Sequence, residues 1–384
     1  MPRLLFVNRV CWPEEAATAQ LLINLADGLA QLDWDCHIIS GSKGGPERAG
    51  NRLTFHQPNG RGVQTSRGLI AKAIAYRQFT NAVIRFLPNF IMPGDRVIAM
   101  TDPPLIGTKI APTVQRHEAH LWHWVQDVYP EVAIALSQNA LVRMAFRTLI
   151  GSRNRAWSAA EQIVPIGQDM ADLIRQQTGP DASIDIIPNW YPAAVEPEVA
   201  TNFRERWQIG HQMLLVIYSG NLGRAHILSP MLDIAEKCEA AGISIHFAFV
   251  GDGAQKDRLI LEVKERGLTN ISFQPPVPRD ELDSLLQAAD IHFVSMRPEC
   301  RGTVLPSKFY GIMAAGRPCI FIGPQNGDLP ELIRSHNLGI ACEPFEIGPA
   351  VDYHTRLVSN PDVAEESCRS VKKYQTSLPN ATDS

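Results

Sequence analysis

The position of Lys308 indicates a bound ligand more clearly than that of any other residue. It follows Pro306 and Ser307 in the stretch TVLPSKFYGIMAAGRP (residues 303–318), which predicts a helix with Ser307 as its N-cap. The dipole of a helix favours anions in the first turn and disfavours a cation there. A bound anion such as a diphosphate would explain the lysine. A solvent-facing lysine tolerated at small cost is the alternative.

Gly311 lies one turn further along the same predicted helix. Glycine inside a helix costs roughly 0.5–1 kcal/mol relative to alanine. The missing side chain leaves space either for a sugar or ribose ring or for close packing against a neighbouring helix. The sequence leaves both interpretations open.

Two further stretches place glycines where a predicted strand gives way to a helix. YSGNLGRAH (residues 218–226) contributes Gly220, Asn221, Gly223 and Arg224, and VGDGAQ (residues 250–255) contributes Gly251, Asp252 and Gly253. Glycines let the backbone approach a phosphate closely, and an arginine adds a charge-assisted hydrogen bond. The alternatives are a plain turn with an exposed arginine and, for the second stretch, an aspartate that caps the next helix.

These three strand ends together predict a ligand that carries a diphosphate. The chain has no GxxxxGK[ST] motif, and neither glycine turn forms a full GxGxxG followed by a ribose-binding acid about 20 residues later. These absences count against a P-loop nucleoside triphosphatase and against an NAD-binding domain. A nucleotide sugar fits the pattern better than NAD or ATP.

The elements that must hold these turns occur twice along the chain. Apolar runs that predict strands alternate with amphipathic stretches that predict helices, both before and after a proline-rich segment. This pattern predicts an α/β fold of two doubly wound halves, each a parallel sheet with helices on both faces. The expected parts are an N-terminal domain at 1–190, a linker at 191–212, a second domain at 213–345, and a C-terminal helix and tail at 346–384. The richest site is expected in a cleft between the two halves.

Composition excludes several classes of function. At 384 residues, 45% hydrophobic and 20% charged, the chain can bury sizeable cores, and its formal charge of −4 gives no reason to expect a nucleic-acid partner. Its seven cysteines are scattered without a CxxC pair or metal-ligand spacing, which is typical of a reducing compartment. No apolar run has the length of a signal-peptide core or of the ~20 residues of a membrane span, so we expect a cytoplasmic protein.

Basic residues gather in two runs of the first half. Residues 51–94 and residues 132–160 contain arginines or lysines but no acidic residue. The second run includes ALVRMAFRTLIGSRNRAW (residues 140–157), which interleaves apolar and basic residues at helical spacing. Such a helix either lies on an anionic bilayer or is an ordinary amphipathic helix whose arginines face water.

The order and spacing of these motifs resemble the family 4 glycosyltransferases of the GT-B fold, and most of all the branch of colanic-acid and other exopolysaccharide enzymes. PSKFYGIMAAGRP resembles the donor-site helix of that family, and YSGNLGRAH, VGDG, NRVCWPEEAATAQLLINLADGLA and WVQDVYPEVAIAL are similar to the same branch. The resemblance implies two Rossmann-like domains that face each other across a cleft. It also implies transfer of a sugar from a nucleotide-diphosphate co-substrate with retention of configuration, without a metal or other cofactor.

The resemblance further implies where the substrates bind. The donor would lie mostly on the C-terminal domain and the acceptor on the N-terminal one. Acceptors in this branch are often saccharides on a polyprenyl diphosphate at the membrane, which agrees with the basic runs. We therefore expect a saccharide or lipid-linked saccharide acceptor, an anionic membrane surface as a partner, and a peripheral position on the inner face of the cell membrane.

Carried over residue by residue, the resemblance assigns a donor site. The residues that would face the donor diphosphate or its sugar are Gly220, Asn221, Gly223, Arg224, Gly251, Asp252, Gly253, Pro306, Ser307, Lys308 and Gly311. Pro276 and Val277, in the QPPV turn, would hold the nucleobase largely through the backbone. Lys308 is also expected to act in catalysis.

On the acceptor side, Asp127 and His123 fall near the reacting sugar. A carboxylate there would orient or deprotonate an acceptor hydroxyl, whereas an N-cap for the next helix is the alternative for Asp127. Glu14 and Thr18, after the first predicted strand, would line the same cleft.

One departure from the family concerns the donor sugar. Many members carry a Glu-x7-Glu pair across this loop and helix. Its second position is Gly311, and its first is Thr303 or Arg301, depending on the alignment. Glu299 is the only carboxylate nearby, and we expect it to reach the donor sugar as a catalytic residue.

Two other functions stay open. A GT-B nucleotide-sugar epimerase would need a cluster of carboxylates and histidine in the cleft, for which the sequence supplies few candidates. A non-catalytic nucleotide-sugar-binding relative is favoured by the missing glutamate pair. The retained lysine and glycine turns speak against it.

Overall fold

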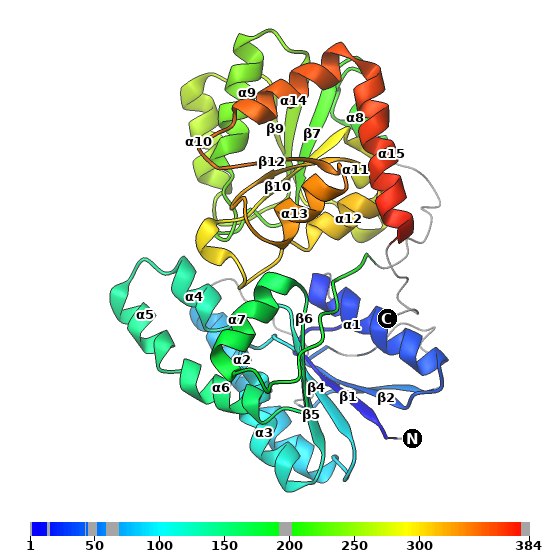
Figure 1. Cartoon of the computed structure of the whole chain (residues 1–384), viewed down its shortest axis with the longest axis vertical. Helices are drawn as coiled ribbons and strands as arrows, with labels where there is room; N and C mark the ends of the chain where they lie inside the picture. The colour runs from blue at the N-terminus through cyan, green and yellow to red at the C-terminus, as the bar shows by residue number, and fades with distance from the viewer. Residues whose placement is uncertain are drawn as a thin grey trace. The chain divides into compact units, whose positions relative to one another are not determined.

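The computed structural model describes residues 2–13, 16–42, 44, 52–58, 69–191 and 202–377. The chain divides into two compact units, which Figure 1 shows with their elements labelled. The first contains the described residues up to 191 and the short segment 302–305. The second contains the described residues from 202 to 301 and from 306 onward.

A six-stranded parallel sheet forms the centre of the first unit, in the order β3-β2-β1-β4-β5-β6. Its strands are β1 (Leu4–Val7), β2 (Cys36–Ile39), β3 (Leu53–His56), β4 (Arg96–Ala99), β5 (His120–Val125) and β6 (Gln162–Pro165). Its helices are α1 (Ala17–Gln31), α2 (Leu69–Phe86), the 3-10 helix η1 (Leu87–Asn89), α3 (Ile106–Arg116), α4 (Glu131–Leu136), α5 (Ala140–Arg147), α6 (Ile150–Ser158) and α7 (Gln168–Thr178).

Alternation along β1 explains why helices cover both faces of this sheet. Leu4 and Phe6 belong to a core cluster with residues of α1, whereas Leu5 and Val7 belong to a cluster with residues of α2 and α3. Successive side chains of a strand point to opposite faces. Because both faces are covered, all four residues are apolar and buried, as expected for a parallel sheet.

A second six-stranded parallel sheet forms the centre of the other unit, in the order β12-β11-β10-β7-β8-β9. Its strands are β7 (Leu214–Ser219), β8 (Ile245–Val250), β9 (Ile271–Gln274), β10 (Ile291–Ser295), β11 (Cys319–Ile322) and β12 (Gly339–Cys342). Its helices are α8 (Phe203–Arg206), α9 (Ser229–Ala240), α10 (Lys256–Arg266), η2 (Arg279–Glu281), α11 (Leu282–Ala288), η3 (Pro298–Cys300), α12 (Lys308–Ala314), α13 (Asp328–Ser335), α14 (Gly348–Ser359) and α15 (Pro361–Ser377).

Both sheets have a point where the strand order reverses. β1 lies between β2 and β4, and β7 lies between β8 and β10. At such a point the connections leave neighbouring strands toward opposite faces, so a crevice opens at the carboxyl edge of the sheet. The residues that directly follow β1 and β4, and those that follow β7 and β10, are therefore placed to bind ligands.

The two doubly wound halves expected from the sequence are confirmed, and three details differ. The stretch 140–157, expected as one helix, is broken into α5 and α6 around Thr148 and Leu149. Within the expected linker at 191–212, α8 belongs to the second unit, and its Phe203 is buried in the core of that unit. In place of the one helix and tail expected at 346–384, the described residues 346–377 form α14 and α15, which pack against each other within the second unit.

Candidate functional site

The turn after β7 lies at the crevice of the second unit. Gly220 has a φ of +116°, which a residue with a side chain rarely adopts. Its N–H donates to the last residue of β8 at 2.9 Å, and Leu222 N–H donates to Asp252 O at 2.9 Å. No partner is found within the described ranges for the N–H groups of Asn221 and Gly223. The turn therefore retains two backbone donors for a ligand.

The second glycine turn packs directly against the first. A Cβ on Gly251 would overlap Gly220 O, and a Cβ on Gly253 would lie 2.6 Å from Asn221 Oδ1. The space left by these two missing side chains is therefore filled by the neighbouring turn rather than left open to a ligand. The structure gives both glycines a packing role, and their contact with a donor stays a prediction.

Asp252 does not cap the next helix, because α10 has Gln255 at its N-cap. Instead, Asp252 Oδ1 accepts the N–H of Gly253 at 2.8 Å. Gln255 Nε2 donates to the carbonyl oxygens of Gly223 at 2.6 Å and His226 at 3.1 Å, so this side chain holds the first turn in place. The sequence offered no signal for Gln255, since nothing local marks a contact with a residue 32 positions earlier.

Lys308 is the first residue of α12, as predicted, and Ser307 occupies the N-cap without a capping hydrogen bond from its side chain. Lys308 Nζ is inaccessible to solvent and has no hydrogen-bond partner among the described residues. It lies 3.4 Å from the centre of the Tyr218 ring, and a Cβ on Gly220 would lie 3.8 Å from it. Burial holds the pKa of Lys308 well below its usual value. The amine thus stands beside the glycine turn with its hydrogen-bonding capacity unused.

A second cation lies next to the same turn. Arg224 is exposed, and its carbonyl oxygen accepts a hydrogen bond from Arg297 Nε at 2.7 Å. Arg297, which follows β10, was not selected from the sequence, although its place after a strand was a usable signal. Pro276 and Val277 follow β9 at the other side of β8, and Val277 packs against the core. Arg224 therefore follows β7, the strand that ends in the glycine turn, whereas the QPPV turn follows β9, two strands away in the sheet.

The remaining donor-side candidates lie around α12. Pro306 is buried, and its carbonyl oxygen accepts the N–H of Phe309 at 3.1 Å. Gly311 is buried in the middle of the helix. Glu299 is exposed on η3, after β10. Contact of Glu299 with a donor sugar stays a prediction.

Asp127 follows β5 at the carboxyl edge of the first sheet and is partly buried. It is not an N-cap, because α4 has Pro130 in that position. Burial and, second, the charge of Asp102 raise the pKa of Asp127 to about 6, against the opposing effect of Lys72. A carboxylate with such a pKa is ionised at neutral pH and is still basic enough to accept a proton.

Three further side chains lie near Asp127: Arg9 and Asp102, which follow two other strands, and Tyr76 of α2. Arg9, which follows β1, donates to both carboxylate oxygens of Asp102, which follows β4, at 2.7 and 2.9 Å. The Arg9 guanidinium carbon lies 5.1 Å from the centre of the Tyr76 ring. Burial, the charge of Asp102 and that of Asp127 raise the pKa of Tyr76. Sequence reasoning missed all three residues, although Arg9 and Asp102 lie within three residues of the ends of β1 and β4.

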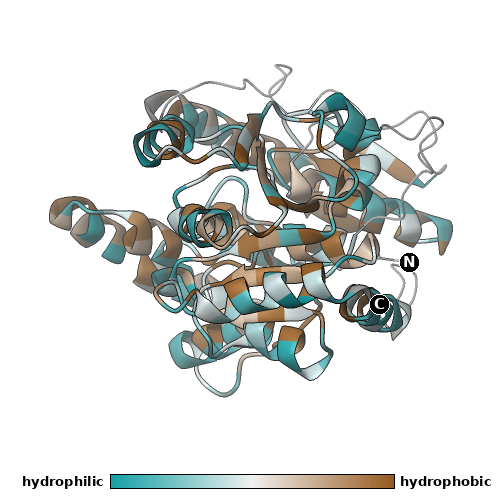
Figure 2. Ribbon diagram, turned by 90° about the horizontal axis from the view of Figure 1, so that it is seen from above, coloured by the Kyte–Doolittle hydropathy of each residue, from teal (hydrophilic) through white to brown (hydrophobic). Residues whose placement is uncertain are grey.

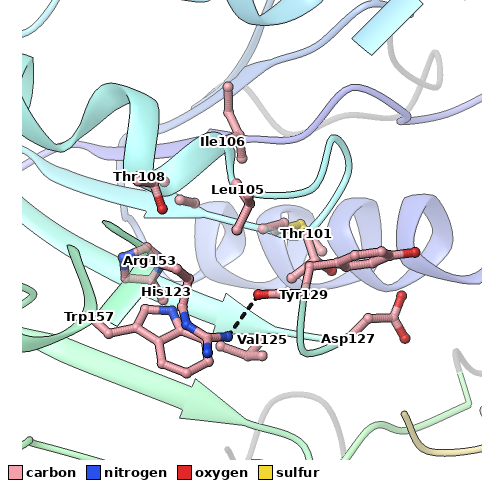
Figure 3. Close-up of a pocket in the computed structure, with 13 residues that line it drawn as sticks. Thr101, Leu105, Ile106, Thr108, His123, Val125, Asp127, Tyr129, Arg153 and Trp157 are labelled. Atoms are coloured by element: carbon pink, nitrogen blue, oxygen red, sulfur yellow. Dashed lines mark hydrogen bonds between the residues drawn. The ribbon is translucent and has the colours of Figure 1, made fainter. Parts of the chain in front are cut away.

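His123 lies deeper in the unit than Asp127. It is only 6% exposed, and a Cβ on Gly107 of α3 would lie 2.7 Å from its Nδ1. The cavity beside it has a volume of about 30 Å³, enough for roughly one or two water molecules and too small for a sugar. Figure 3 shows the Asp127 carboxylate directed away from the His123 ring. Burial lowers the pKa of His123 to about 4, so the ring is neutral at neutral pH. Its contact with a substrate stays a prediction.

Arg153 lines the same cavity and is 2% exposed. It donates to both carboxylate oxygens of Glu131, at 2.5 and 3.0 Å, and to Tyr129 O at 2.7 Å, the bond drawn in Figure 3. Its guanidinium carbon also lies 3.7 Å from the centre of the Trp157 ring. Arg153 belongs to the basic run 132–160, but its charge is paired inside the unit and is not presented to an outside partner.

Of the two acceptor-side candidates near the first strand, Thr18 lies in the first turn of α1 and is partly buried. Glu14 falls outside the described residues, as do Arg61 and Arg67 of the first basic run. Within the described ranges, no group of three or more His, Cys, Asp or Glu side chains could hold a metal ion. No helix in that part of the chain is both long and apolar enough to cross a membrane.

Comparisons with known proteins agree with this architecture. Residues 199–377 match the family model of the glycosyl transferases group 1. The chain is 27% identical over 260 residues to a probable glycosyltransferase, WbjE, of Pseudomonas aeruginosa, covering 65% of this chain and 63% of that protein. It is 28% identical over 170 residues to a putative colanic acid biosynthesis glycosyl transferase, WcaI, of Escherichia coli, covering 43% of this chain and 41% of that protein. The chain thus spans less than two thirds of the length of either relative.

The fold is shared over the whole chain with a solved structure. The Anabaena protein HepE, in complex with UDP-glucose, superimposes with a TM-score of 0.71 over 99% of this chain and 96% of that one, at 14% identity. The match of residues 199–377, the similarity to a putative colanic acid biosynthesis glycosyl transferase and the two doubly wound sheets agree with the resemblance carried by the motifs. Residues 199–377 are thus similar to the group 1 glycosyltransferases, and the chain has the GT-B fold.

Proposed function

We propose that this protein transfers a sugar from a nucleotide-diphosphate donor to a saccharide acceptor with retention of configuration. The observation that carries the proposal is Lys308, whose Nζ is buried without a hydrogen-bond partner beside a glycine turn with two unused N–H groups. A buried amine without a partner is costly unless an anion completes its environment. The UDP-glucose in the Anabaena structure supports a nucleotide sugar as that anion.

The chemistry of the donor follows from these residues. When the bond between the sugar and the diphosphate breaks, negative charge develops on the diphosphate oxygens. Lys308 and the N–H groups of Asn221 and Gly223 would stabilise that charge as donors held in place by the fold, and the exposed Arg224 would add a second cation. Two cations and two N–H groups supply this stabilisation without a metal ion, so we propose that none is required.

On the acceptor side, we propose that Asp127 binds and activates the acceptor hydroxyl. Its carboxylate would accept a hydrogen bond from the hydroxyl, orient the oxygen toward the anomeric carbon, and take up the proton as the glycosidic bond forms. The pKa of about 6 suits this task, because the group is ionised at neutral pH. From the similarity to a putative colanic acid biosynthesis glycosyl transferase we infer that the acceptor is a saccharide on a polyprenyl diphosphate.

The proposed reaction is tested with a panel of UDP-, GDP- and dTDP-sugars. We expect one of these to bind, and to be consumed with transfer to a lipid-linked saccharide acceptor. The anomeric configuration of the product, read by NMR, tests retention. Conversion of the donor into an epimer without an acceptor would favour the epimerase instead. Failure of every nucleotide to bind would contradict the donor assignment.

We further propose that α5 docks on an anionic membrane surface, which would place the protein on the inner face of the cell membrane. No residue of α5 is buried. Its apolar side chains are exposed to solvent, with Leu141 72% exposed and Met144 62% exposed. Figure 1 shows α5 at the periphery of the first unit, and Figure 2 shows brown, apolar stretches along the same projecting helices. Arg143 and Arg147 lie on the same helix, and no acidic residue occurs from 132 to 160. Exposed apolar residues flanked by arginines favour an anionic bilayer.

The membrane proposal predicts salt-sensitive flotation of the protein with vesicles that contain phosphatidylglycerol, and weak flotation with phosphatidylcholine alone. A double variant, Leu141→Ser with Met144→Ser, is expected to lose most of this binding. Leu261→Ser is the matched control, because Leu261 is 60% exposed on α10, outside the proposed surface. Equal flotation with both lipids, or equal losses for both variants, would count against α5 as the docking element.

A further inference from the structure

We propose that Tyr218 is a positioning residue that joins the two halves of the donor site, Lys308 and the glycine turn. The inference rests on the proposed function, since it assigns a role within the anion site described above. Tyr218 is the fifth residue of β7, and neither its type nor its place in an apolar strand marked it as functional. Two different parts of its side chain contact the two halves of the site.

The ring contacts the lysine. Lys308 Nζ lies 3.4 Å from the ring centre, which is well within the range of a cation–π interaction. Among the described residues, Nζ has no hydrogen-bond acceptor. The electron-rich face of the Tyr218 ring is therefore the group that interacts with the ammonium. The ring therefore holds the amine in place and favours its charged form where burial disfavours it.

The hydroxyl contacts the turn. Tyr218 Oη donates to Asn221 O at 2.7 Å, and this bond fixes the residue at the centre of the 220–223 turn. The same turn presents the unused N–H groups of Asn221 and Gly223. The Asn221 carbonyl shares its peptide plane with the Leu222 N–H, which donates to Asp252 O at 2.9 Å. The bond from Tyr218 therefore helps to fix the peptide plane that lies between the two unused N–H groups, and it limits their direction through the backbone angles of Asn221 and Leu222.

The ring itself is held from its other sides. Tyr218 is completely buried, and its ring packs against those of Phe249, Phe293 and His226, with centroid distances of 6.0, 6.5 and 5.8 Å. His226 is fixed in turn by a 2.6 Å hydrogen bond between Nδ1 and Ser295 O. Tyr218 is thus a rigid side chain of the core whose face and hydroxyl set the relative positions of an amine and a backbone turn.

The test separates the two contacts with two variants in two backgrounds. Tyr218→Phe removes the hydroxyl bond and keeps the ring, and Tyr218→Leu removes both. Each is made in the wild-type protein and in Lys308→Met, and the Kd for UDP, GDP and dTDP is measured by calorimetry. The nucleotide that binds wild type most tightly is carried through the series. Tyr353→Phe is the matched control, since it removes a hydroxyl bond to Ser367 between α14 and α15.

We expect Tyr218→Phe to raise the Kd about fivefold in both backgrounds, which is the effect of one hydrogen bond. Tyr218→Leu is expected to raise it about 20- to 50-fold in wild type, because the cation–π contact is lost as well. In the Lys308→Met background the same change is expected to raise the Kd only about fivefold, because that variant has no ammonium for the ring to hold in position. Tyr353→Phe should leave the Kd unchanged.

A purely structural role of Tyr218 would give the opposite pattern. The cost of Tyr218→Leu would then be the same with and without Lys308, and Tyr218→Phe would not restore binding. Either result overturns the inference, and unfolding curves of each variant show whether a loss comes from instability. If wild type binds none of the three nucleotides, the proposed function fails instead, so the two failures are distinguishable.

Discussion

Asp127→Asn is expected to lower kcat by about 10²- to 10⁴-fold while leaving the Kd of the nucleotide sugar unchanged. The amide keeps the shape of the side chain and can still orient a hydroxyl, but it cannot accept the proton. Because the donor is proposed to bind on the second unit, its affinity should not depend on Asp127. Steady-state kinetics with the donor identified by the panel, together with calorimetric binding, measure both quantities.

The pH dependence of the same step has a definite sign. The pKa of Asp127 is raised to about 6, so the carboxylate is protonated below that pH and ionised above it. A base that must be ionised gives a rate that rises as pH passes through about 6 and levels off above it. Lys72 lowers this pKa, so Lys72→Met is expected to move the rising limb to higher pH. Asp127→Asn should abolish the limb.

Asp172→Asn is the matched control, because Asp172 is a surface carboxylate of the same unit whose side chain is 54% exposed. It should leave both the rate and the pH profile unchanged. An Asp127→Asn variant with wild-type turnover would show that the acceptor proton is taken elsewhere. A lowered rate with an unchanged limb would mean that Asp127 orients the acceptor and does not take up its proton.

Lys308→Met is expected to lower kcat/KM and nucleotide affinity by between about 10- and 100-fold, the effect of a lost charge-assisted hydrogen bond. Methionine has a similar length and the same kind of apolar stem, so it should still fill most of the space beside the Tyr218 ring. Lys237→Met, an exposed lysine on α9, is the control for loss of a positive charge. An unchanged affinity in Lys308→Met would mean that the diphosphate binds elsewhere.

Binding of the donor should also take up a proton. Burial holds the pKa of Lys308 below its usual value in the free protein, whereas a diphosphate next to the amine favours the charged form and raises that pKa. Between these two pKa values the free amine is neutral and the bound one is charged. Burial and the charge of Lys308 hold the pKa of nearby His226 at about 4, and burial does the same for His292. Neither histidine is therefore expected to contribute to the proton uptake above pH 5.

Calorimetry of nucleotide-sugar binding in two buffers of different ionisation heat measures this uptake. The nucleotide sugar is the suitable probe, since its diphosphate carries no proton that titrates near neutral pH. Lys308→Met is expected to bind without proton uptake. Uptake that persists in this variant would assign the titrating group to another residue.

The prediction of the fold and part of the site from sequence depended on local patterns. In β1 and β7, four or more consecutive apolar residues indicated strands covered on both faces, and the structure confirms both. Lys308 was selected because a cation in the first turn of a helix conflicts with the helix dipole. That conflict is local, so it was visible without knowledge of any distant contact.

The basic run 132–160 shows where local patterns were insufficient. Its arginines are alike in the sequence, yet Arg153 is paired with Glu131 in the interior while Arg147 is exposed on α5. Helical spacing gives the face on which a side chain lies. It does not give the element that covers that face, and here the partly buried carboxylate of Glu131 on α4 pairs with Arg153 and not with Arg147.

The sequence by itself determined that this chain forms two doubly wound α/β units with glycine turns at strand ends, and it selected Lys308 as a candidate partner for an anion. Both conclusions depend on periodicity and on neighbours within a few residues. Only the tertiary structure decided that Gly251 and Gly253 make room for the neighbouring turn, and that Tyr218 lies under Lys308. The reason is that parallel strands bring their carboxyl ends to one edge, so residues 30 to 90 positions apart meet there, and no local pattern records which pairs come into contact.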